Sequence, residues 1–309
     1  MIRGIYRKED KKGSRFLTIG TFDGVHLGHQ KLFSQLKEMK KNDDDIISVV
    51  TFEPHPRIFF KSMENLSLIT IIEERVRLLL EHVDEVIVLK FDESLSKLSP
   101  EEFISFLCNN FKIDAIIEGE NFHFGHGKGG NVNLLKTFGK QFGFCVDIAD
   151  LYIFDGLPIS SSRIRRQIIS GKIEEANKLL GWNFYISGEV VHGDRIGTFL
   201  GFPTANLRLP DYKIIPQSGV YSTDVEVSGK KYLGALNIGV KPTIGGKKRT
   251  VEVHLIDFDG NLYQEVVTVN FKFKIRDEVK FDSIAALKKQ IKLDIEKIID
   301  TSYEGNENR

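Results

Sequence analysis

Two histidines near the start of the chain lie in a glycine-rich segment that could hold a phosphate group. The segment Thr18–His29 reads TIGTFDGVHLGH, and its glycines, which let the backbone turn and approach a ligand, are Gly20, Gly24 and Gly28. His26 and His29 are three residues apart, so at a helix start both imidazoles point the same way. The free N–H groups and the dipole of a helix start favour anions. Two imidazoles beside them could donate hydrogen bonds to phosphoryl oxygens as charge builds on an α-phosphate.

The same pair of histidines is compatible with two other roles. Histidines at this spacing can bind a metal ion, although no third ligand is evident nearby. They could also be structural residues of a tight turn. From the residues alone, a phosphate site, a metal site and a structural turn all stay open.

A proline-rich segment could add a wall to such a site. Thr51–Pro56 reads TFEPHP and follows an apolar run. Pro54 and Pro56 make the chain around His55 stiff and non-helical, so the loop could pack against a flat ligand. An ordinary connecting loop would have the same composition.

Two later segments carry polar groups that suit nucleotide or ring recognition. Gly119–Gly130 reads GENFHFGHGKGG, and its Asn121 can both donate to and accept from a polar ring edge. Ile159–Arg163 reads ISSSR, and Ser161 and Ser162 could cap a helix that begins there.

A second polar group lies in the C-terminal part. Gly188–Asn206 reads GEVVHGDRIGTFLGFPTAN, and its glycines Gly193, Gly197 and Gly201 indicate a flexible loop over a ligand. Thr204 and Asn206 are two residues apart, so in an extended chain they share one face. A hydroxyl and an amide oxygen on one face suit Mg²⁺ that carries phosphates.

Glu252 and Arg276 are further candidates whose pattern allows two interpretations. Glu252 lies in Val251–Phe258 (VEVHLIDF), where alternate residues are apolar. Periodicity alone favours a solvent-facing carboxylate, because glutamate is rarely buried without a partner. Arg276, in the charged segment FKIRDEVKF, could be an ordinary surface residue.

The predicted secondary structure that must position these residues changes from alternating strands and helices to short strands near residue 182. Before it, apolar runs alternate with helical stretches, which predicts a parallel sheet with helices on both faces. The predicted strands are Phe16–Ile19, Ile46–Phe52, Val86–Phe91, Ile113–Ile117 and Phe144–Ile148. The predicted helices are Leu32–Met39, Glu73–His82, Pro100–Asn110, Val132–Phe142, Ser162–Ile169 and Ile173–Leu180. Ligands bind such sheets beyond the carboxyl ends of the strands.

After Trp182 the hydrophobic period becomes two. Short alternating segments are divided by glycines, as in Ser228-Gly229 and Gly245-Gly246, which predicts an antiparallel sheet or small barrel. One amphipathic helix, Ser283–Ile299, follows. We therefore expect two domains, 1–182 and 183–309.

Composition excludes several classes of protein. Lys+Arg and Asp+Glu both number 43, so the chain lacks the basic excess of a non-specific nucleic-acid binder. No apolar run is long enough to cross a membrane, and no apolar stretch that could be a secretory signal precedes Arg15. Two cysteines, Cys108 and Cys145, exclude a disulfide framework and favour the cytoplasm, and we expect both to be buried. No stable protein partner is indicated.

Taken together and in this order, the motifs resemble those of the bacterial bifunctional riboflavin kinase/FMN adenylyltransferase family, also called FAD synthetase. SGVY at 218–221 and NIGVKPT at 237–243 add to the resemblance, which runs from Thr18 to about Ile298. It implies a Rossmann-like α/β/α nucleotidyltransferase domain followed by a riboflavin kinase-like β-barrel. It also implies that ATP phosphorylates riboflavin to FMN, that a second ATP adenylylates FMN to FAD with release of pyrophosphate, and that Mg²⁺ assists.

The resemblance also implies roles for individual residues. His26, His29 and Arg163 would stabilise charge in adenylyl transfer, and Glu252 would be the base of the kinase. The implied contacts to ATP in the N-terminal domain are Gly20, Phe22, Asp23, Gly24, Gly28, Ser161 and Ser162. The implied flavin contacts are Pro54, His55, Pro56, Asn121 and Arg276. The implied ATP contacts in the barrel are Gly193, Gly197, Gly201, Thr204 and Asn206, of which Thr204 and Asn206 would bind Mg²⁺.

Two positions depart from the family pattern. The family usually has threonine at the position of Ser162, and a hydroxyl is retained. It often has arginine or another polar residue at the position of His123, so we assign no role to His123 or His126.

Three other functions compete with this one. The chain could be a single-activity enzyme with one domain kept as a scaffold, but both sets of motifs are intact. It could be a flavin-sensing module that acts on RNA without turnover, but its charge is balanced. It could transfer a nucleotide to another phosphorylated alcohol, as a cytidylyltransferase does, but GFPTAN and the predicted barrel argue against this.

Overall fold

The computed structural model describes residues 1–60, 66–193, 196–243 and 246–307, and the chain divides into two compact units. These are Met1–Ser161 and Ser162–Arg309, so the division falls at the start of helix α7 (Ser161–Ile169) and not after Trp182. Helix α8 (Ile173–Leu180) therefore belongs to the second unit. Its Asn177 accepts a hydrogen bond from the amide of Phe184 at 2.8 Å and donates one to the carbonyl of Phe271 at 3.1 Å.

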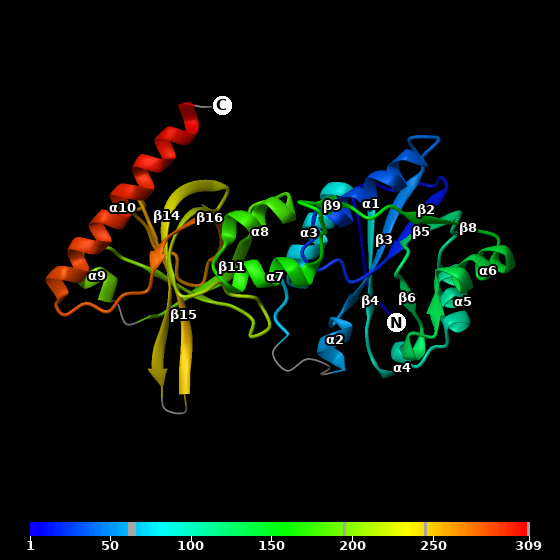
Figure 1. The fold of residues 1–309 in the computed structure, drawn as a ribbon, viewed down its shortest axis with the longest axis horizontal. Helices are drawn as coiled ribbons and strands as arrows, with labels where there is room; N and C mark the ends of the chain where they lie inside the picture. Colours follow the sequence, from blue (N-terminus) through cyan, green and yellow to red (C-terminus); the bar gives the residue numbers. More distant parts are fainter. Residues whose placement is uncertain (61–65, 194–195, 244–245, 308–309) are drawn as a thin grey trace. The chain divides into compact units, whose positions relative to one another are not determined.

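The first unit is built on a six-stranded sheet in the order β1-β4-β3-β2-β5-β8 (Figure 1). The parallel strands are β2 (Arg15–Ile19), β3 (Ile46–Glu53), β4 (Glu85–Lys90), β5 (Ala115–Gly119) and β8 (Cys145–Ala149). All five were predicted from their apolar runs. Strand β2 lies between β3 and β5, so the strand order reverses beside it, and ligands bind doubly wound sheets at such a point.

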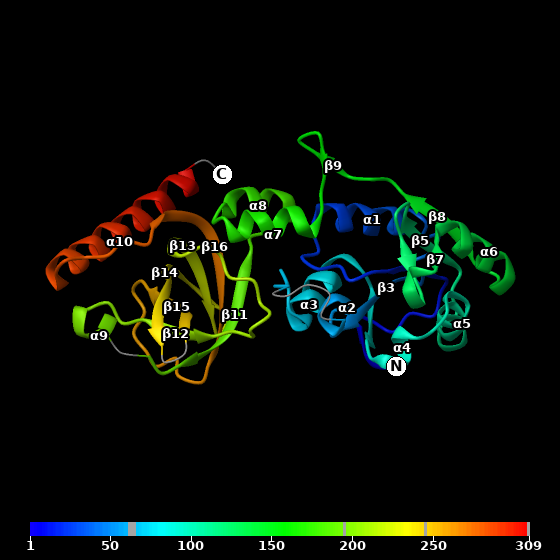
Figure 2. The same cartoon turned by 60° about the horizontal axis from the view of Figure 1, so that its bottom comes forward.

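Four longer helices connect these strands (Figure 2). They are α1 (Leu27–Glu38), α3 (Ile72–His82), α5 (Pro100–Asn110) and α6 (Val132–Phe142). Helices α1 and α3 pack on each other and on β3 and β4. Leu107 of α5 and Leu135 of α6 share one core with Leu17 and Ile19 of β2. The predicted arrangement of a sheet wound with helices is confirmed.

The ends of the helices follow from local sequence. Ser99 accepts from the amide of Glu102 and Glu102 accepts from the amide of Ser99, which is a capping box in front of Pro100. Helix α6 ends at Gly143, whose φ of 84° is the left-handed conformation that glycine adopts without strain. Short elements fill the loops: α2 (Pro56–Phe59), α4 (Glu93–Ser96), β6 (His123–Phe124), η1 (His126–Lys128), β7 (Gly130–Asn131), β9 (Ile153–Phe154) and β10 (Leu157–Pro158).

The structure differs from the sequence-based prediction at both edges of this sheet. Strand β1 (Ile2–Arg7) was not predicted, and it pairs antiparallel with β4, so the sheet is mixed. Its side chains are nearly all exposed and give no alternating pattern. The expected burial of both cysteines is wrong: Cys108 is half-buried, but Cys145 is exposed because it begins β8, the other edge strand.

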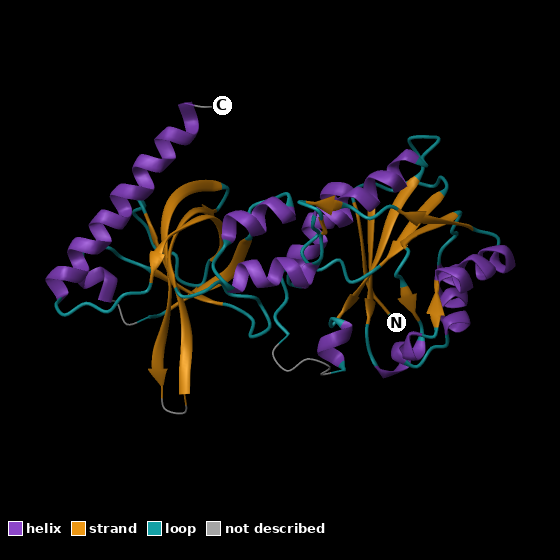
Figure 3. Cartoon of the chain, viewed as in Figure 1, coloured by secondary structure: helices purple, strands orange, loops and turns teal. Residues whose placement is uncertain are grey.

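The second unit contains a closed antiparallel barrel in the order β11-β12-β15-β14-β13-β16 (Figure 3). The strands are β11 (Tyr185–Val191), β12 (Ala205–Arg208), β13 (Gly219–Val227), β14 (Lys230–Thr243), β15 (Gly246–Leu255) and β16 (Val266–Asp277). Helix α9 (Ile196–Leu200) lies between β11 and β12. The terminal helix α10 (Ile284–Glu307) extends beyond its predicted end at Ile299. The barrel that the alternating pattern favoured is confirmed.

Candidate functional site

The glycine-rich segment runs from the carboxyl end of β2 into helix α1, at the point where the strand order reverses. His26 is the N-cap of α1, and its Nδ1 accepts from the amide of His29 at 3.4 Å. The two imidazole rings stack, with centroids 3.6 Å apart and planes 16° from parallel. The prediction that both side chains point the same way is confirmed.

His29 has an unsatisfied polar atom in a largely apolar setting. The ring of Phe22 packs edge-on against it, with centroids 5.1 Å apart. Nδ1 of His29 is buried and makes no hydrogen bond within the part of the chain that the structure describes. Burial, and next the charge of His26, hold the pKa of His29 well below 6.5. His29 is therefore held as a neutral imidazole, and its buried Nδ1 keeps a hydrogen-bonding capacity that the described residues do not use.

The other half of the loop is anchored from inside the protein. The Asp23 carboxylate, 1% exposed, accepts from the amides of Ile69 at 3.1 Å and Thr70 at 2.9 Å. The Thr70 hydroxyl donates to Asp23 at 3.2 Å and accepts from the amide of Gly24 at 3.0 Å. Gly24 has a φ of +87°, which glycine adopts without strain. Asp23 thus holds the loop in shape, and its contact with ATP stays a prediction.

The ISSSR segment meets this loop through one hydroxyl. Ser161 Oγ donates to the carbonyl of Asp23 at 2.9 Å. Ser162 is exposed and Arg163 is half-buried on α7, both within the second compact unit. The structure therefore brings Ser161 to the glycine-rich loop, whereas the roles of Ser162 and Arg163 stay predictions.

Two buried charged residues that the sequence did not single out support the same region. Glu118, at the end of β5, accepts from the amide of Ile19 at 2.5 Å and from the Thr18 hydroxyl at 3.3 Å. Burial raises the pKa of Glu118 well above its ordinary value. A glutamate inside the apolar run AIIEG was the signal that could have found it.

The second of these residues is Arg75 on α3, which is fully buried. It donates to the carbonyl of Thr21 at 2.9 Å and to the Glu53 carboxylate at 3.3 Å. Thr21 belongs to the glycine-rich segment and Glu53 to TFEPHP, so one guanidinium holds the two motifs together.

The predicted flavin contacts of the first unit lie in loops at the carboxyl ends of β3 and β5. His55 is buried and caps helix α2, where its Nδ1 accepts from the amide of Arg57 at 3.1 Å. Pro54 and Pro56 are half-buried beside it, and Asn121 is exposed after β5. Contact of these four residues with a flavin stays a prediction.

The aromatic and histidine residues around Asn121 have structural surroundings. Phe124 is part of the core, and Phe122 stacks on it with centroids 5.3 Å apart. His123 is exposed, and Nδ1 of His126 lies 3.0 Å from the carbonyl of Ser96. The structure gives no reason to assign the two histidines a chemical role.

In the barrel, Glu252 on β15 lies between two asparagines on neighbouring strands. It pairs with Asn206 of β12 on one side and with Asn237 of β14 on the other. The Thr204 hydroxyl, one residue before β12, donates to Glu252 Oε2 at 3.5 Å. The structure therefore brings Thr204, Asn206 and Glu252 together. Asn237 lies in the NIGVKPT motif and was not predicted to be a site residue. The strand register places it beside Glu252.

The glycines of the preceding loop are needed because the loop packs tightly against these residues. A Cβ at Gly193 would overlap the side-chain amide of Asn206, and a Cβ at Gly197 would overlap the carbonyl of Phe202. Gly201 has a φ of +88°, the left-handed conformation. The loop approaches Thr204 and Asn206 more closely than a side chain would allow.

A cavity of about 250 Å³ adjoins Thr204. Thr198 and Pro203 line it on one side, and the connection between β15 and β16, from Phe258 to Tyr263, lines it on another. Its walls are both polar and apolar, and its size suits part of a nucleotide.

Arg276 is engaged within the second unit. Its Nε lies 3.0 Å and its Nη2 2.9 Å from Asp294 Oδ2, so it ties β16 to helix α10. Its guanidinium also lies 5.6 Å from the ring centre of Phe281. Arg276 therefore differs from the ordinary surface arginine that the sequence left open as an alternative, and its contact with a flavin stays a prediction.

The first unit is doubly wound and has a glycine-rich loop with paired histidines at its switch point, and the barrel has a hydroxyl, an amide and a carboxylate side by side. Together these features define a two-domain nucleotide-dependent transferase. A family model for FAD synthetase matches residues 8–163, and one for riboflavin kinase matches residues 180–301. The chain belongs to the bifunctional riboflavin kinase/FMN adenylyltransferase family.

Curated relatives with the same description match over nearly the full length. The protein of Buchnera aphidicola subsp. Schizaphis graminum is 41% identical over 96% of each chain. That of Escherichia coli K12 is 37% identical over 95% of each chain. A crystal structure of a Streptococcus pneumoniae protein, described as a macrolide-efflux protein, superposes with a TM-score of 0.84 at 34% identity and covers 94% of this chain and 95% of its own.

Among the described residues, no helix has the length and hydropathy to span a membrane.

Proposed function

We propose that the two reactions of this family are divided between the two parts of the chain, with adenylyl transfer in residues 8–163 and phosphoryl transfer in the barrel. The chain phosphorylates riboflavin to FMN and adenylylates FMN to FAD. The observation that supports the division most is that each family model covers one chemically complete set of residues. The paired histidines lie in one set and the Thr204–Asn206–Glu252 group in the other.

In the barrel, Glu252 would act as the general base. Its carboxylate would accept the proton of the ribityl 5′-hydroxyl as that oxygen attacks the γ-phosphorus of ATP and ADP leaves. The Thr204 hydroxyl at 3.5 Å and the flanking asparagines would orient the carboxylate. The 250 Å³ cavity beside Thr204 is the proposed place for part of ATP, next to the loop of Gly193, Gly197 and Gly201.

The donor set beside Glu252 fits Mg²⁺. Thr204 and Asn206 offer hard oxygen ligands, and the described residues contain no group of three or more His, Cys, Asp or Glu that would hold a metal unaided. This suits an ion that keeps its waters and shares phosphate oxygens. When bound, Mg²⁺ neutralises phosphate charge; Thr204 and Asn206 would hold it at the γ-phosphate end of ATP.

In the first unit, a phosphate oxygen of FMN would attack the α-phosphorus of ATP, forming a new P–O bond while pyrophosphate leaves. The FMN phosphate is already ionised, so charge stabilisation matters more than a strong base. The imidazoles of His29 and His26 and the N-terminal amides of α1 would supply it. Ser161, Ser162 and Arg163 would bind the triphosphate.

The flavin contacts are the remaining part of the proposal. Pro54, His55, Pro56 and Asn121 would contact FMN, and Arg276 would lie near the flavin in the barrel. Riboflavin, FMN and ATP would be its small-molecule partners. The two free cysteines favour a cytoplasmic location.

Incubation of the full chain with riboflavin, ATP and Mg²⁺, followed by chromatography, tests the overall reaction. We expect FMN to appear first and FAD after it, with ADP and pyrophosphate as co-products. If only one flavin product forms from riboflavin and none from supplied FMN, the chain has a single activity and the other domain is a scaffold.

A further inference from the structure

A second cavity lies in the first unit, at the amino ends of the sheet strands. The histidine pair lies at the opposite, carboxyl ends. The cavity has a volume of about 480 Å³. Ile47, near the start of β3, and Asp84, just before β4, both line it. Because β2, β3 and β4 are parallel, this edge is formed by their amino ends, whereas the glycine-rich loop leaves the carboxyl end of β2.

The walls of this cavity are rich in cations. Lys8, Lys37, Lys40 and Lys41 line it, against two carboxylates, Asp43 and Asp84. The Asp84 carboxylate is already shared between two lysines. One of its oxygens accepts from Lys11 at 3.0 Å and the other from Lys40 at 3.3 Å. No carboxylate in the described part of the chain pairs with Lys8 or Lys37. The cavity therefore carries uncompensated positive charge.

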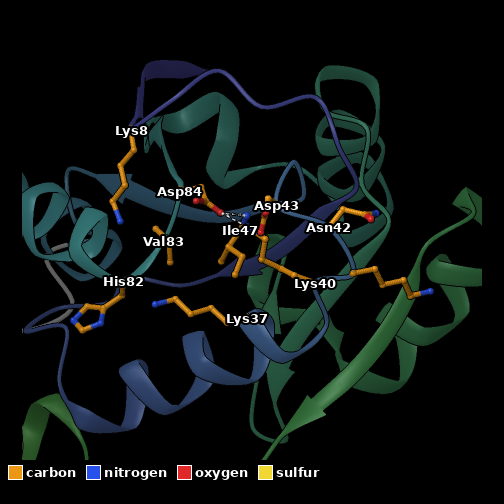
Figure 4. Close-up of a pocket in the computed structure, with 10 residues that line it drawn as sticks. Lys8, Lys37, Lys40, Asn42, Asp43, Ile47, His82, Val83 and Asp84 are labelled. Carbon is orange, nitrogen blue, oxygen red and sulfur yellow. Dashed lines mark hydrogen bonds and ion pairs between the residues drawn. The ribbon is translucent and has the colours of Figure 1, made fainter.

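The two uncompensated ammonium groups face one imidazole. Figure 4 shows the ends of Lys8 and Lys37 directed into the space beside His82. The half-buried His82 ends helix α3, and its ring lies 6.1 Å from that of Phe33. Burial, then the charges of Lys37 and Lys8, lower the pKa of His82, which agrees with this geometry.

Helix electrostatics account for only part of this arrangement. Lys37 lies in the last turn of α1, where cations are favourable because the helix dipole is negative. The helix dipole does not explain the position of Lys8, because Lys8 follows strand β1 and belongs to no helix. Three elements thus direct cationic or neutral nitrogen donors into one cavity, and an anion would relieve their mutual repulsion.

We propose that this cavity binds the diphosphate group of a small molecule, with phosphate oxygens between Lys8 and Lys37 and against His82. Compact ammonium groups bind phosphate as point charges, and an imidazole nitrogen donates to a phosphate oxygen. Inorganic pyrophosphate and a nucleoside diphosphate share this chemistry. The site is separate from both proposed catalytic sites and does not depend on their assignment.

Histidine NMR on the full chain tests the proposal at the level of one residue. The protein is labelled with ¹³C-histidine, and the His82 signal is assigned by its loss in His82→Gln. Inorganic pyrophosphate is titrated in the presence of EDTA, with KCl adjusted to keep ionic strength constant. We expect a saturable shift of the His82 signal and a rise in its pKa with ligand bound. A parallel titration with ADP distinguishes a nucleotide, which would bind more tightly, from pyrophosphate alone.

Matched variants separate specific binding from general charge. Lys8→Ala/Lys37→Ala should weaken pyrophosphate binding at His82 by at least about fivefold, since exposed charge contacts are individually modest. Lys112→Ala/Lys136→Ala removes two exposed lysines of the same unit outside the cavity and should change nothing. A His82 signal that does not saturate, or that responds equally in both double variants, would overturn the proposal. If the first double variant does not fold, Lys8→Ala and Lys37→Ala are titrated singly, and each should weaken binding.

Discussion

The imidazole rings of His26 and His29 stack with their centroids 3.6 Å apart. At this distance two positive rings repel each other, so the pair does not carry two charges. His29 is the ring that loses its proton, because burial and the charge of His26 both lower its pKa. The pair therefore places a neutral His29 ring against His26 at the start of α1.

Replacing His29 should separate the two activities. His29→Ala removes a ring that reaches a phosphate oxygen only in the proposed adenylyl-transfer site, so we expect FAD formation from FMN to fall by about 10²–10³-fold. FMN formation from riboflavin should be unchanged, as measured by chromatography. His126→Ala, at an exposed histidine of the same unit, is the control and should leave both activities intact. Loss of both activities in a folded His29→Ala protein would contradict the division of sites.

The buried histidine should also make stability depend on pH. Unfolded His29 has the ordinary pKa of 6.5, whereas the folded pKa is lower. Between these values the unfolded chain binds more protons, so stability falls as pH drops below about 6.5 and levels off below the folded pKa. The slope contributed by one such group is at most about 1.4 kcal/mol per pH unit.

The free energy of unfolding of the first unit, measured in urea at several pH values between 8 and 5, gives this slope. His29→Gln should have a smaller slope than the wild type. The comparison of the two proteins cancels the contributions of His82, whose lowered pKa acts in the same direction, and of Glu118, whose raised pKa acts in the opposite direction. Equal slopes in the wild type and His29→Gln would show that His29 titrates normally in the folded protein.

The hydrogen bonds around Asp23 should support both stability and adenylyl transfer. Thr70→Val removes the hydroxyl that donates to Asp23 and accepts from Gly24, and we expect a loss of about 1–3 kcal/mol in the free energy of unfolding. FAD formation should fall while FMN formation persists. Thr70→Ser keeps the hydroxyl and should restore both properties. A stable Thr70→Val protein with full FAD synthesis would show that the loop does not need this anchor.

Glu252 should be required for the kinase reaction alone. Glu252→Gln keeps the shape of the side chain but cannot accept a proton, so FMN formation should drop by about 10²–10⁴-fold. FAD formation from supplied FMN should be normal. Glu226→Gln, at an exposed position of β13, is the matched control and should have no effect. Near-normal FMN formation by Glu252→Gln would assign the base to another group.

The ion pair of Arg276 and Asp294 should stabilise the barrel against α10. Arg276→Ala and Asp294→Ala should each lower the free energy of unfolding by about 1–3 kcal/mol, and the double variant should lose little more than either one. If Arg276 also contacts the flavin, as proposed, its variant alone should raise KM for riboflavin. Strictly additive losses in a double-mutant cycle would contradict the pairing.

Local sequence signals predicted most of the fold. Helices 100–110 and 132–142 were predicted from their apolar spacing with the ends that the structure gives them, and Ser99, Pro100 and Gly143 are the residues that fix those ends in the fold. The start of α1 was missed by five residues, since Gly28, His29 and Gln30 interrupt the apolar period and His26 caps the helix unexpectedly. Strand β1 was missed because an edge strand with exposed side chains has no amphipathic pattern.

The site was predicted where its residues lie within one motif, and missed where contacts span the chain. Thr204 lies one residue before β12 and Asn206 lies on it, so their spacing of two residues is a local feature of the sequence. Asp23 meets Thr70, and Arg276 meets Asp294, through contacts between separate elements. Such pairs depend on tertiary packing, which motif spacing does not encode.

Glu118 has a consequence for how substrates approach the first unit. An ionised carboxylate at the mouth of the switch point would repel every incoming triphosphate. Burial between β2 and β5 favours its protonated form, so the acid joins the two halves of the sheet without adding negative charge there. The amides and imidazoles of the glycine-rich loop can then attract an anion without added repulsion from Glu118.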